Sequence, residues 1–170
     1  MTQEQTFNVL FLCAGNSARS IMAEVLMGRW GKGRFRAWSA GSHPAGEVHP
    51  RTLALLNRFN LPTQGLRSKS WDELTVEGAP ELDFVFTVCD RAASETCPVW
   101  PGRPITAHWS VEDPVAVTGD DAAIDKAFRN AFLVLEARIK LFTALRIETL
   151  DSLTLRRQLD AIGGSRETAA

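Results

Sequence analysis

The amino-acid sequence predicts a single-domain, three-layer α/β/α fold around a four-stranded parallel sheet. Short apolar segments alternate along the chain with longer segments whose apolar residues recur at helical spacing. The segment 82–88 is almost continuously apolar, which is typical of a strand buried on both faces. Because helices separate the strands, right-handed crossovers are expected, with a parallel sheet covered on both sides.

The elements are expected in a regular order. Strands are predicted at residues 8–12, 35–40, 82–88 and 105–109. A helix is expected from near Ser17 to Gly31, and a second begins at His49-Pro50, where proline suits the first turn. Residues 70–73 form a capping box for a short helix. The longest helix opens at 119–121, and a short one is expected at 151–162.

Length and composition agree with one globular domain. The chain has 170 residues, 45% of them apolar and 23% charged, and its net charge is −1, so nothing in the charge favours nucleic acid or membrane. No secretory signal or membrane-spanning segment is recognisable, and a cytoplasmic monomer is expected. We divide the chain into an N-terminal extension (1–6), a catalytic domain (7–145) and a C-terminal helix and tail (146–170).

A loop of small residues follows the first expected strand. After Cys13 come Ala14, Gly15, Asn16, Ser17, Ala18, Arg19 and Ser20. Where such a loop enters a helix, its N–H groups and the helix dipole favour both a bound anion and a cysteine thiolate. Arg19 can hold two anion oxygens in a fork, Asn16 tolerates a left-handed backbone, and Ser17 or Ser20 can donate a hydrogen bond to the sulfur. The loop predicts a tetrahedral-oxyanion site with Cys13 as nucleophile.

Further candidate residues follow other strands. Cys89 comes directly after the third predicted strand, and Asp113 follows the fourth. Ligands of parallel sheets bind outside the carboxyl ends of the strands, so Cys13, Cys89 and Asp113 are expected to gather at one edge. The three cysteines are interpreted as catalytic or redox-active residues, and no metal site is expected, because no tight Cys-x2-Cys pair is present.

The pattern Cys-x5-Arg-Ser after an N-terminal strand resembles the low-molecular-weight protein tyrosine phosphatase family, and more closely its bacterial arsenate reductase branch. The resemblance covers about residues 7–145. It includes the segments 39–41 and 83–89, and also 108–109 leading into 112–114. The resemblance implies that Asp113, in its Asp-Pro pair, is a general acid.

The resemblance also implies a thiol–disulfide relay through Cys13, Cys89 and Cys97 that reduces arsenate to arsenite. Phosphate is the expected competing anion. Thioredoxin, or glutathione with glutaredoxin, would supply the electrons, and no cofactor would be tightly bound. Seven residues separate Cys89 from Cys97, one more than the resemblance implies for thioredoxin-coupled members.

Two other functions stay open at this point. The same loop would serve a tyrosine or small-molecule phosphatase that forms a cysteinyl-phosphate. Against this, residues 115–117 are Val-Ala-Val where that branch has aromatic residues, Ala18 stands where it often has a second cysteine, and the chain contains no tyrosine. A non-catalytic thiol sensor of arsenite or soft metals is the third hypothesis.

Overall fold

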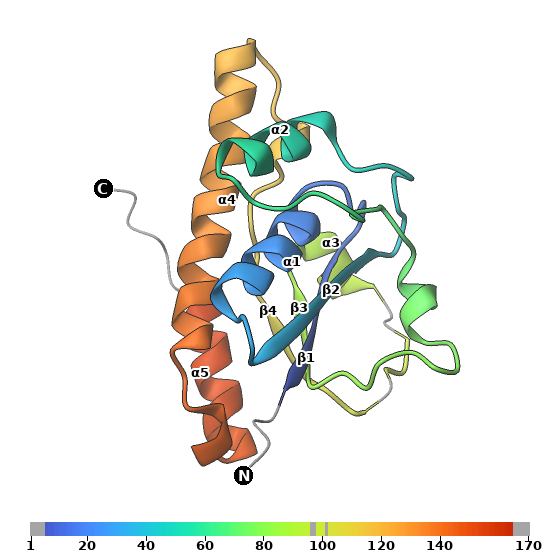
Figure 1. The fold of residues 1–170 in the computed structure, drawn as a ribbon, viewed down its shortest axis with the longest axis vertical. Helices are drawn as coiled ribbons and strands as arrows, with labels where there is room; N and C mark the ends of the chain where they lie inside the picture. Colours follow the sequence, from blue (N-terminus) through green and yellow to red (C-terminus); the bar gives the residue numbers. More distant parts are fainter. Residues whose placement is uncertain (1–5, 96–97, 101, 165–170) are drawn as a thin grey trace.

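A parallel sheet of four strands, in the order β2-β1-β3-β4, forms the centre of the protein (Figure 1). The computed structural model describes residues 6–95, 98–100 and 102–164. The strands are β1 (Phe7–Cys13), β2 (Phe35–Gly41), β3 (Phe84–Thr87) and β4 (Ile105–His108). The predicted fold class is confirmed, and all four strands form where the apolar segments predicted them.

The register of the sheet places Cys13 at the end of the sheet where the parallel strands have their carboxyl termini. β1 lies between β2 and β3, with Cys13 opposite Gly41 on β2 and Leu12 opposite Thr87 on β3. Residues 9–12 of β1 are completely buried because helices or loops cover both faces of the central strand. Cys89 and Asp113 follow the ends of β3 and β4 at this same edge.

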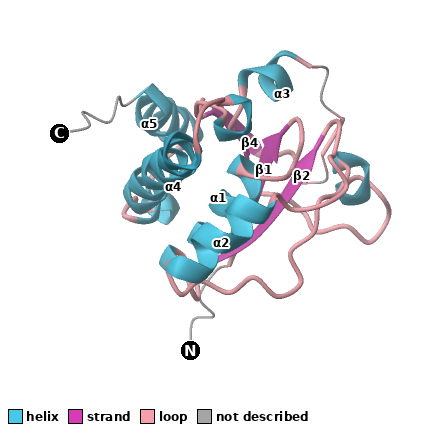
Figure 2. Ribbon diagram, turned by 90° about the horizontal axis from the view of Figure 1, so that it is seen from above, coloured by secondary structure: helices cyan, strands magenta, loops and turns pink. Residues whose placement is uncertain are grey.

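Helices cover the two faces of the sheet unequally. α1 (Arg19–Trp30), α2 (Pro50–Arg58) and the long α4 (Asp121–Thr143) pack together on one side. The short α3 (Asp90–Ser94) lies on the opposite side (Figure 2). Three single-turn 3-10 helices, η1 (Trp71–Leu74), η2 (Pro114–Ala116) and η3 (Ile147–Thr149), lie within the connections. In the described parts of the chain, no helix combines the length and apolar character needed to cross a bilayer.

The helices α1, α2 and α4 and the C-terminal helix begin close to the residues that the sequence indicated, whereas α3 was not predicted. His49 and Asp120 cap α2 and α4 by accepting backbone N–H groups through their side chains. Ser70 caps η1 in the same way, but the predicted capping box is incomplete. The Glu73 carboxylate pairs with Arg67 instead of returning to the backbone of Ser70, so a single 3-10 turn forms.

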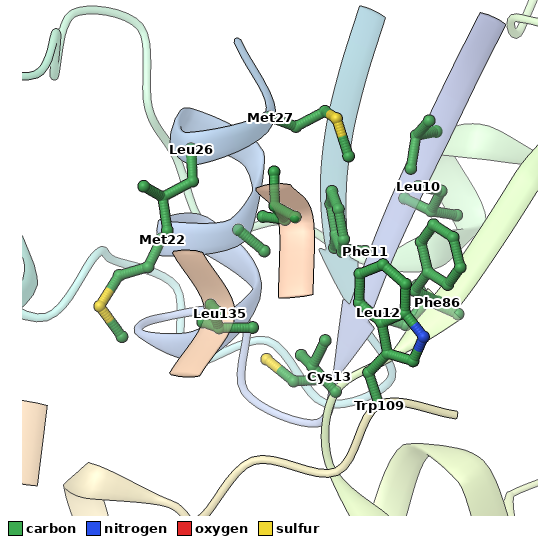
Figure 3. Packing of buried hydrophobic residues seen from close by; sticks show 14 of the residues in the cluster. Leu10, Phe11, Leu12, Cys13, Met22, Leu26, Met27, Phe86, Trp109 and Leu135 are labelled. Carbon is green, nitrogen blue, oxygen red and sulfur yellow. The ribbon is translucent and has the colours of Figure 1, made fainter. Parts of the chain in front are cut away.

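The helix α5 (Ser152–Gly164) packs against β4, which is the edge strand farthest from β2, and against α4. Trp109, which is fully buried, stacks on Phe86 with a centroid separation of 3.9 Å and donates its indole N–H to the carbonyl of Leu159 at 3.0 Å. Figure 3 shows this indole beside Phe86, Leu12 and the Cys13 end of β1. The C-terminal helix is therefore joined to the core directly behind the predicted site.

Candidate active site

Cys13 is the last residue of β1 and is only 3% exposed. Its sulfur accepts the backbone N–H of Asn16 at 3.2 Å and lies 2.9 Å from Ser20 Oγ. Ser20, not Ser17, is therefore the hydroxyl beside the Cys13 sulfur, which the sequence had left open. The turn thus brings a backbone N–H and a hydroxyl onto one sulfur.

Asn16 determines the direction of the hydrogen bonds around Cys13. Its backbone is left-handed, with φ 46°, a conformation that asparagine tolerates better than most residues. Its Oδ1 accepts the N–H of Lys69 at 2.8 Å, so its amide NH₂ faces Ser20 Oγ at 2.8 Å. Because that NH₂ occupies a lone pair of the Ser20 oxygen, the hydroxyl hydrogen is free to be donated to the Cys13 sulfur.

The segment 41–49 covers the outer side of the loop. The N–H groups of His43, Ala45 and His49 donate to the loop carbonyls of residues 14, 15 and 17. With those carbonyls turned outward, the backbone N–H groups of residues 15 and 17–19 meet no acceptor among the residues that the structure describes. Unpaired N–H groups at the start of a helix are the donors that bind oxyanions in proteins.

Arg19 begins α1 and is held by the segment that follows β4. Its Nη1 donates to the carbonyl of Val111 at 3.0 Å, and its Nη2 lies 3.4 Å from Asp113 Oδ2. The side chain is 12% exposed, so its charge is largely removed from water. A guanidinium held in this way keeps further N–H groups for an anion on the loop.

Asp113 reaches the site from the 3-10 turn η2. Its Oδ1 accepts the N–H of Val115 at 3.0 Å, and its other oxygen faces Arg19. Pro114 sets the backbone of the turn and is buried, which keeps the carboxyl group over the loop. A carboxyl group in this place can transfer a proton to an oxygen that leaves an anion bound by Arg19.

Cys89 lies against the same loop from the other side. Its side chain is 2% exposed, and its sulfur accepts the N–H of Ala14, the neighbour of Cys13, at 3.2 Å. It also caps α3 by accepting the N–H of Ala92 at 3.3 Å. Burial raises the pKa of the Cys89 thiol above its usual range. The Ala92 N–H partly offsets this shift, and the nearby Cys13 adds to it.

The structure thus brings four predicted residues together: Cys13, Arg19, Cys89 and Asp113. Cys97 lies outside the described residues. Three other cations each have an acidic neighbour: Arg67 pairs with Glu73, Arg91 with Glu95 and Lys69 with Glu24. A hollow of about 720 Å³ between α1, β2 and residues 59–66 contains none of the four site residues.

One polar cluster beside the site was not predicted. Asp90 Oδ1 accepts hydrogen bonds from His108 Nε2 at 2.8 Å and from Ser110 Oγ at 2.9 Å. Both contacts lower the pKa of the Asp90 carboxyl group. The only signal in the sequence was the position of each residue at the end of a strand. In the described part of the chain, no group of three His, Cys, Asp or Glu side chains is arranged to hold a metal ion.

Most of the chain matches a known family. The sequence model of the family described as low molecular weight phosphotyrosine protein phosphatase matches residues 8–152. The chain belongs to this family. Among its curated relatives, a protein named arsenate reductase from Halalkalibacterium halodurans is 32% identical over 138 residues, covering 79% of this chain and 93% of the relative.

Solved structures of the same family agree with the fold. A crystal structure of arsenate reductase from Archaeoglobus fulgidus is 29% identical, with a TM-score of 0.63 over 81% of this chain and 99% of that one. An arsenate reductase described in its phosphate-binding state is 25% identical, with a TM-score of 0.66 over 82% of this chain and 98% of that one. The family resemblance expected from the residues 13–20 is confirmed.

Proposed function

We propose that the protein reduces arsenate to arsenite at the loop 14–20, with Cys13 as nucleophile. The observation that carries the proposal is the second buried sulfur: Cys89 hydrogen-bonds to the N–H of the residue next to Cys13. A phosphatase needs one thiol, because water resolves its cysteinyl-phosphate, whereas a reductase needs a second thiol to supply electrons. The relatives named arsenate reductase support the same conclusion.

In the first step, the Cys13 thiolate attacks the arsenic atom of bound arsenate. The free N–H groups of the loop and the Arg19 guanidinium hold the arsenate oxygens. A sulfur–arsenic bond forms, one arsenic–oxygen bond breaks, and the hydroxyl group of arsenate leaves as water after taking a proton from Asp113. Arsenic is still pentavalent at this stage, so no electrons have moved.

In the second step, the Cys89 sulfur attacks the sulfur of Cys13. A Cys13–Cys89 disulfide forms, the sulfur–arsenic bond breaks, and its electron pair stays on arsenic, which leaves as trivalent arsenite. Burial raises the pKa of Cys89, so this thiol must lose its proton before it attacks. The two cysteines together lose the two electrons that arsenic gains.

In the third step, Cys97 attacks Cys89, which releases Cys13 and leaves a Cys89–Cys97 disulfide. An external dithiol of the thioredoxin type then reduces this disulfide, and no bound cofactor takes part. A glutathione–glutaredoxin route would instead resolve a mixed disulfide and could spare Cys97. Phosphate competes with arsenate, since the loop recognises tetrahedral oxyanions in general.

The test is to map the thiols by mass spectrometry after adding arsenate without reductant. We expect a Cys89–Cys97 disulfide in the natural protein and a Cys13–Cys89 disulfide in Cys97→Ser. Cys13→Ser should consume no arsenate, and Cys89→Ser should complete at most one round. Continuous turnover by Cys89→Ser with the same reductant would contradict the relay. Strong hydrolysis of an aryl phosphate, with no arsenite released from arsenate and thiols, would instead establish the phosphatase.

A further inference from the structure

The first turn of α3 is attached to the end of the sheet by four polar side chains, which we call the α3 anchor: Thr87, Asp90, His108 and Ser110. The imidazole of His108 bridges two elements. Its Nε2 donates to Asp90 Oδ1 at 2.8 Å, and its Nδ1 lies 2.7 Å from Thr87 Oγ1. Ser110 adds a second hydrogen bond to the same Asp90 oxygen at 2.9 Å. The anchor therefore joins α3 to both β3 and β4.

The sheet side of the anchor is rigid. The Ser110 carbonyl accepts Arg138 Nη1 from α4 at 2.7 Å, and the Trp109 N–H donates to the Thr87 carbonyl at 2.7 Å. Arg138 and Trp109 are both buried. The next carbonyl along the chain, that of Val111, holds Arg19. The segment that positions the anion-binding arginine thus also carries two of the groups that bind Asp90.

On the helix side, the anchor is adjacent to Cys89 in the chain. Asp90 is the next residue along the chain and the first residue of α3, and Cys89 is its N-cap. In this position of α3, the sulfur of Cys89 reaches the N–H of Ala14. The backbone before it is held by hydrogen bonds of Val88 with Leu12 and Val111. A five-residue helix has few internal hydrogen bonds of its own, so its contacts with the sheet help to set where the sulfur lies.

We propose that Asp90 and His108 are positioning residues for Cys89: the α3 anchor holds the Cys89 sulfur beside the Cys13 loop for attack, and its release lets the sulfur leave for Cys97. This inference rests on the proposed function. The exposure of the Asp90–His108 contact suits both the holding and the release of α3, because the Asp90 side chain is 84% exposed and that of His108 is 38% exposed. Exposed polar contacts contribute little, so this contact can open in every cycle, whereas a buried one would resist opening.

The first test measures how often Cys89 leaves its buried position, without any arsenate. The reduced protein is treated with iodoacetamide under native conditions, and modification of each cysteine is followed by mass spectrometry. Trypsin cleavage after Lys69 and Arg91 yields a peptide in which Cys89 is the single cysteine. Labelling requires the sulfur to be exposed, so its rate reports the fraction of molecules in which α3 is released.

Asp90→Ala and His108→Ala are expected to raise the labelling rate of Cys89 by about two- to fivefold, the range of a weak exposed hydrogen bond. Asp90→Asn keeps Oδ1, the atom that accepts both hydrogen bonds, and should label as the natural protein does. Glu73→Gln is the matched control: it removes an exposed carboxylate that pairs with Arg67 away from α3, and should also leave the rate unchanged. Equal labelling of Asp90→Ala and the natural protein, or an equal rise in Glu73→Gln, would overturn the inference.

The second test uses arsenate in the Cys97→Ser background, where the reaction stops at the Cys13–Cys89 disulfide. Asp90→Ala should slow disulfide formation by about two- to fivefold. The arsenate concentration at half-maximal rate should not change, because Arg19 and the loop are untouched. Faster labelling with an unchanged rate of disulfide formation would refute the positioning role. If no variant consumes arsenate, the proposed function fails, while the labelling result still decides whether the anchor holds Cys89.

Discussion

At the scale of single residues, Asn16 organises the site more than any other side chain. Its Oδ1 is occupied by the backbone of Lys69, and its NH₂ directs the hydroxyl of Ser20 toward Cys13. Asn16 is itself fully buried, so these hydrogen bonds are protected from exchange with water. The nucleophile is therefore oriented by a chain of contacts that begins more than fifty residues away in the sequence.

Ser20→Ala is expected to slow the arsenate-dependent oxidation of Cys13 by about ten- to hundredfold. A hydrogen bond to a charged group contributes about 1.5–3 kcal/mol, and the substitution removes one from the thiolate. Single-turnover arsenite release measures the effect.

Two related variants separate this contact from general damage to the loop. Ser20→Thr keeps a hydroxyl and should recover most of the rate. Ser17→Ala leaves the Ser20 contact intact and should slow the reaction less than Ser20→Ala. An equal loss in Ser17→Ala and Ser20→Ala would mean that the hydroxyl beside the sulfur has no special role.

At the scale of elements, the end of β2 shapes the oxyanion loop. Gly41 lies opposite Cys13 in the sheet, and a Cβ on Gly41 would lie 2.4 Å from the Ala14 carbonyl oxygen and 3.0 Å from Asn16 Cβ. Both neighbours belong to the loop, so the lack of a side chain at this position allows the strand and the loop to touch. The residues that follow then satisfy the outward carbonyls of the loop.

Gly41→Ala is expected to displace the loop and to lower the rate of arsenite release by about a hundredfold, as a shift of about 1 Å can do at a reacting centre. Overpacking should also reduce the free energy of unfolding by about 1–3 kcal/mol. Kinetics and denaturant unfolding measure the two effects.

Gly28→Ala provides the comparison. Gly28 lies within α1, and a Cβ there meets nothing within 4 Å. Alanine should stabilise the helix by up to about 1 kcal/mol and leave the rate unchanged. A rate in Gly41→Ala equal to that of Gly28→Ala would show that the close approach of β2 to the loop has no effect on the chemistry.

At the scale of the whole molecule, α5 is part of the same core as the site. The family match ends at residue 152, where α5 begins, yet Leu155, Leu159 and Ile162 of this helix are buried. The hydrogen bond from Trp109 to Leu159 connects α5 to the segment 108–111. The carbonyl of Val111 in this segment accepts the hydrogen bond from Arg19. Loss of α5 would therefore uncover the indole that packs behind the active edge.

Leu159→Ala is expected to lower the free energy of unfolding of the entire domain by about 2–4 kcal/mol, since this side chain is completely buried. The transition should stay single, with the active edge and α5 unfolding together. Thermal and denaturant unfolding followed by tryptophan fluorescence test this. Leu153→Ala, in the same helix but 61% exposed, should change stability little. Unchanged stability in Leu159→Ala would show that α5 is an independent appendage.

Much of this architecture could be predicted because it depends on sequence patterns within short segments of the chain. The apolar segments and their separation by helical periodicities determine a parallel sheet, and that topology alone places Cys13, Cys89 and Asp113 at one edge. The small residues after Cys13 likewise predict an anion-binding turn. The incomplete capping box at Ser70 shows the limit of such patterns, because a tertiary partner, Arg67, competes for Glu73.

The sequence by itself therefore determined the fold class, and it predicted the oxyanion loop and Cys13 as the nucleophile. Only the tertiary structure decided that Ser20 is the hydroxyl beside Cys13, that Lys69 orients Asn16, that residues 43–49 cover the loop, and that Asp90 meets His108. The physical reason is the same in the last three cases. Those contacts join residues whose separation along the chain has no period, so their pairing depends on how the strands, helices and loops pack.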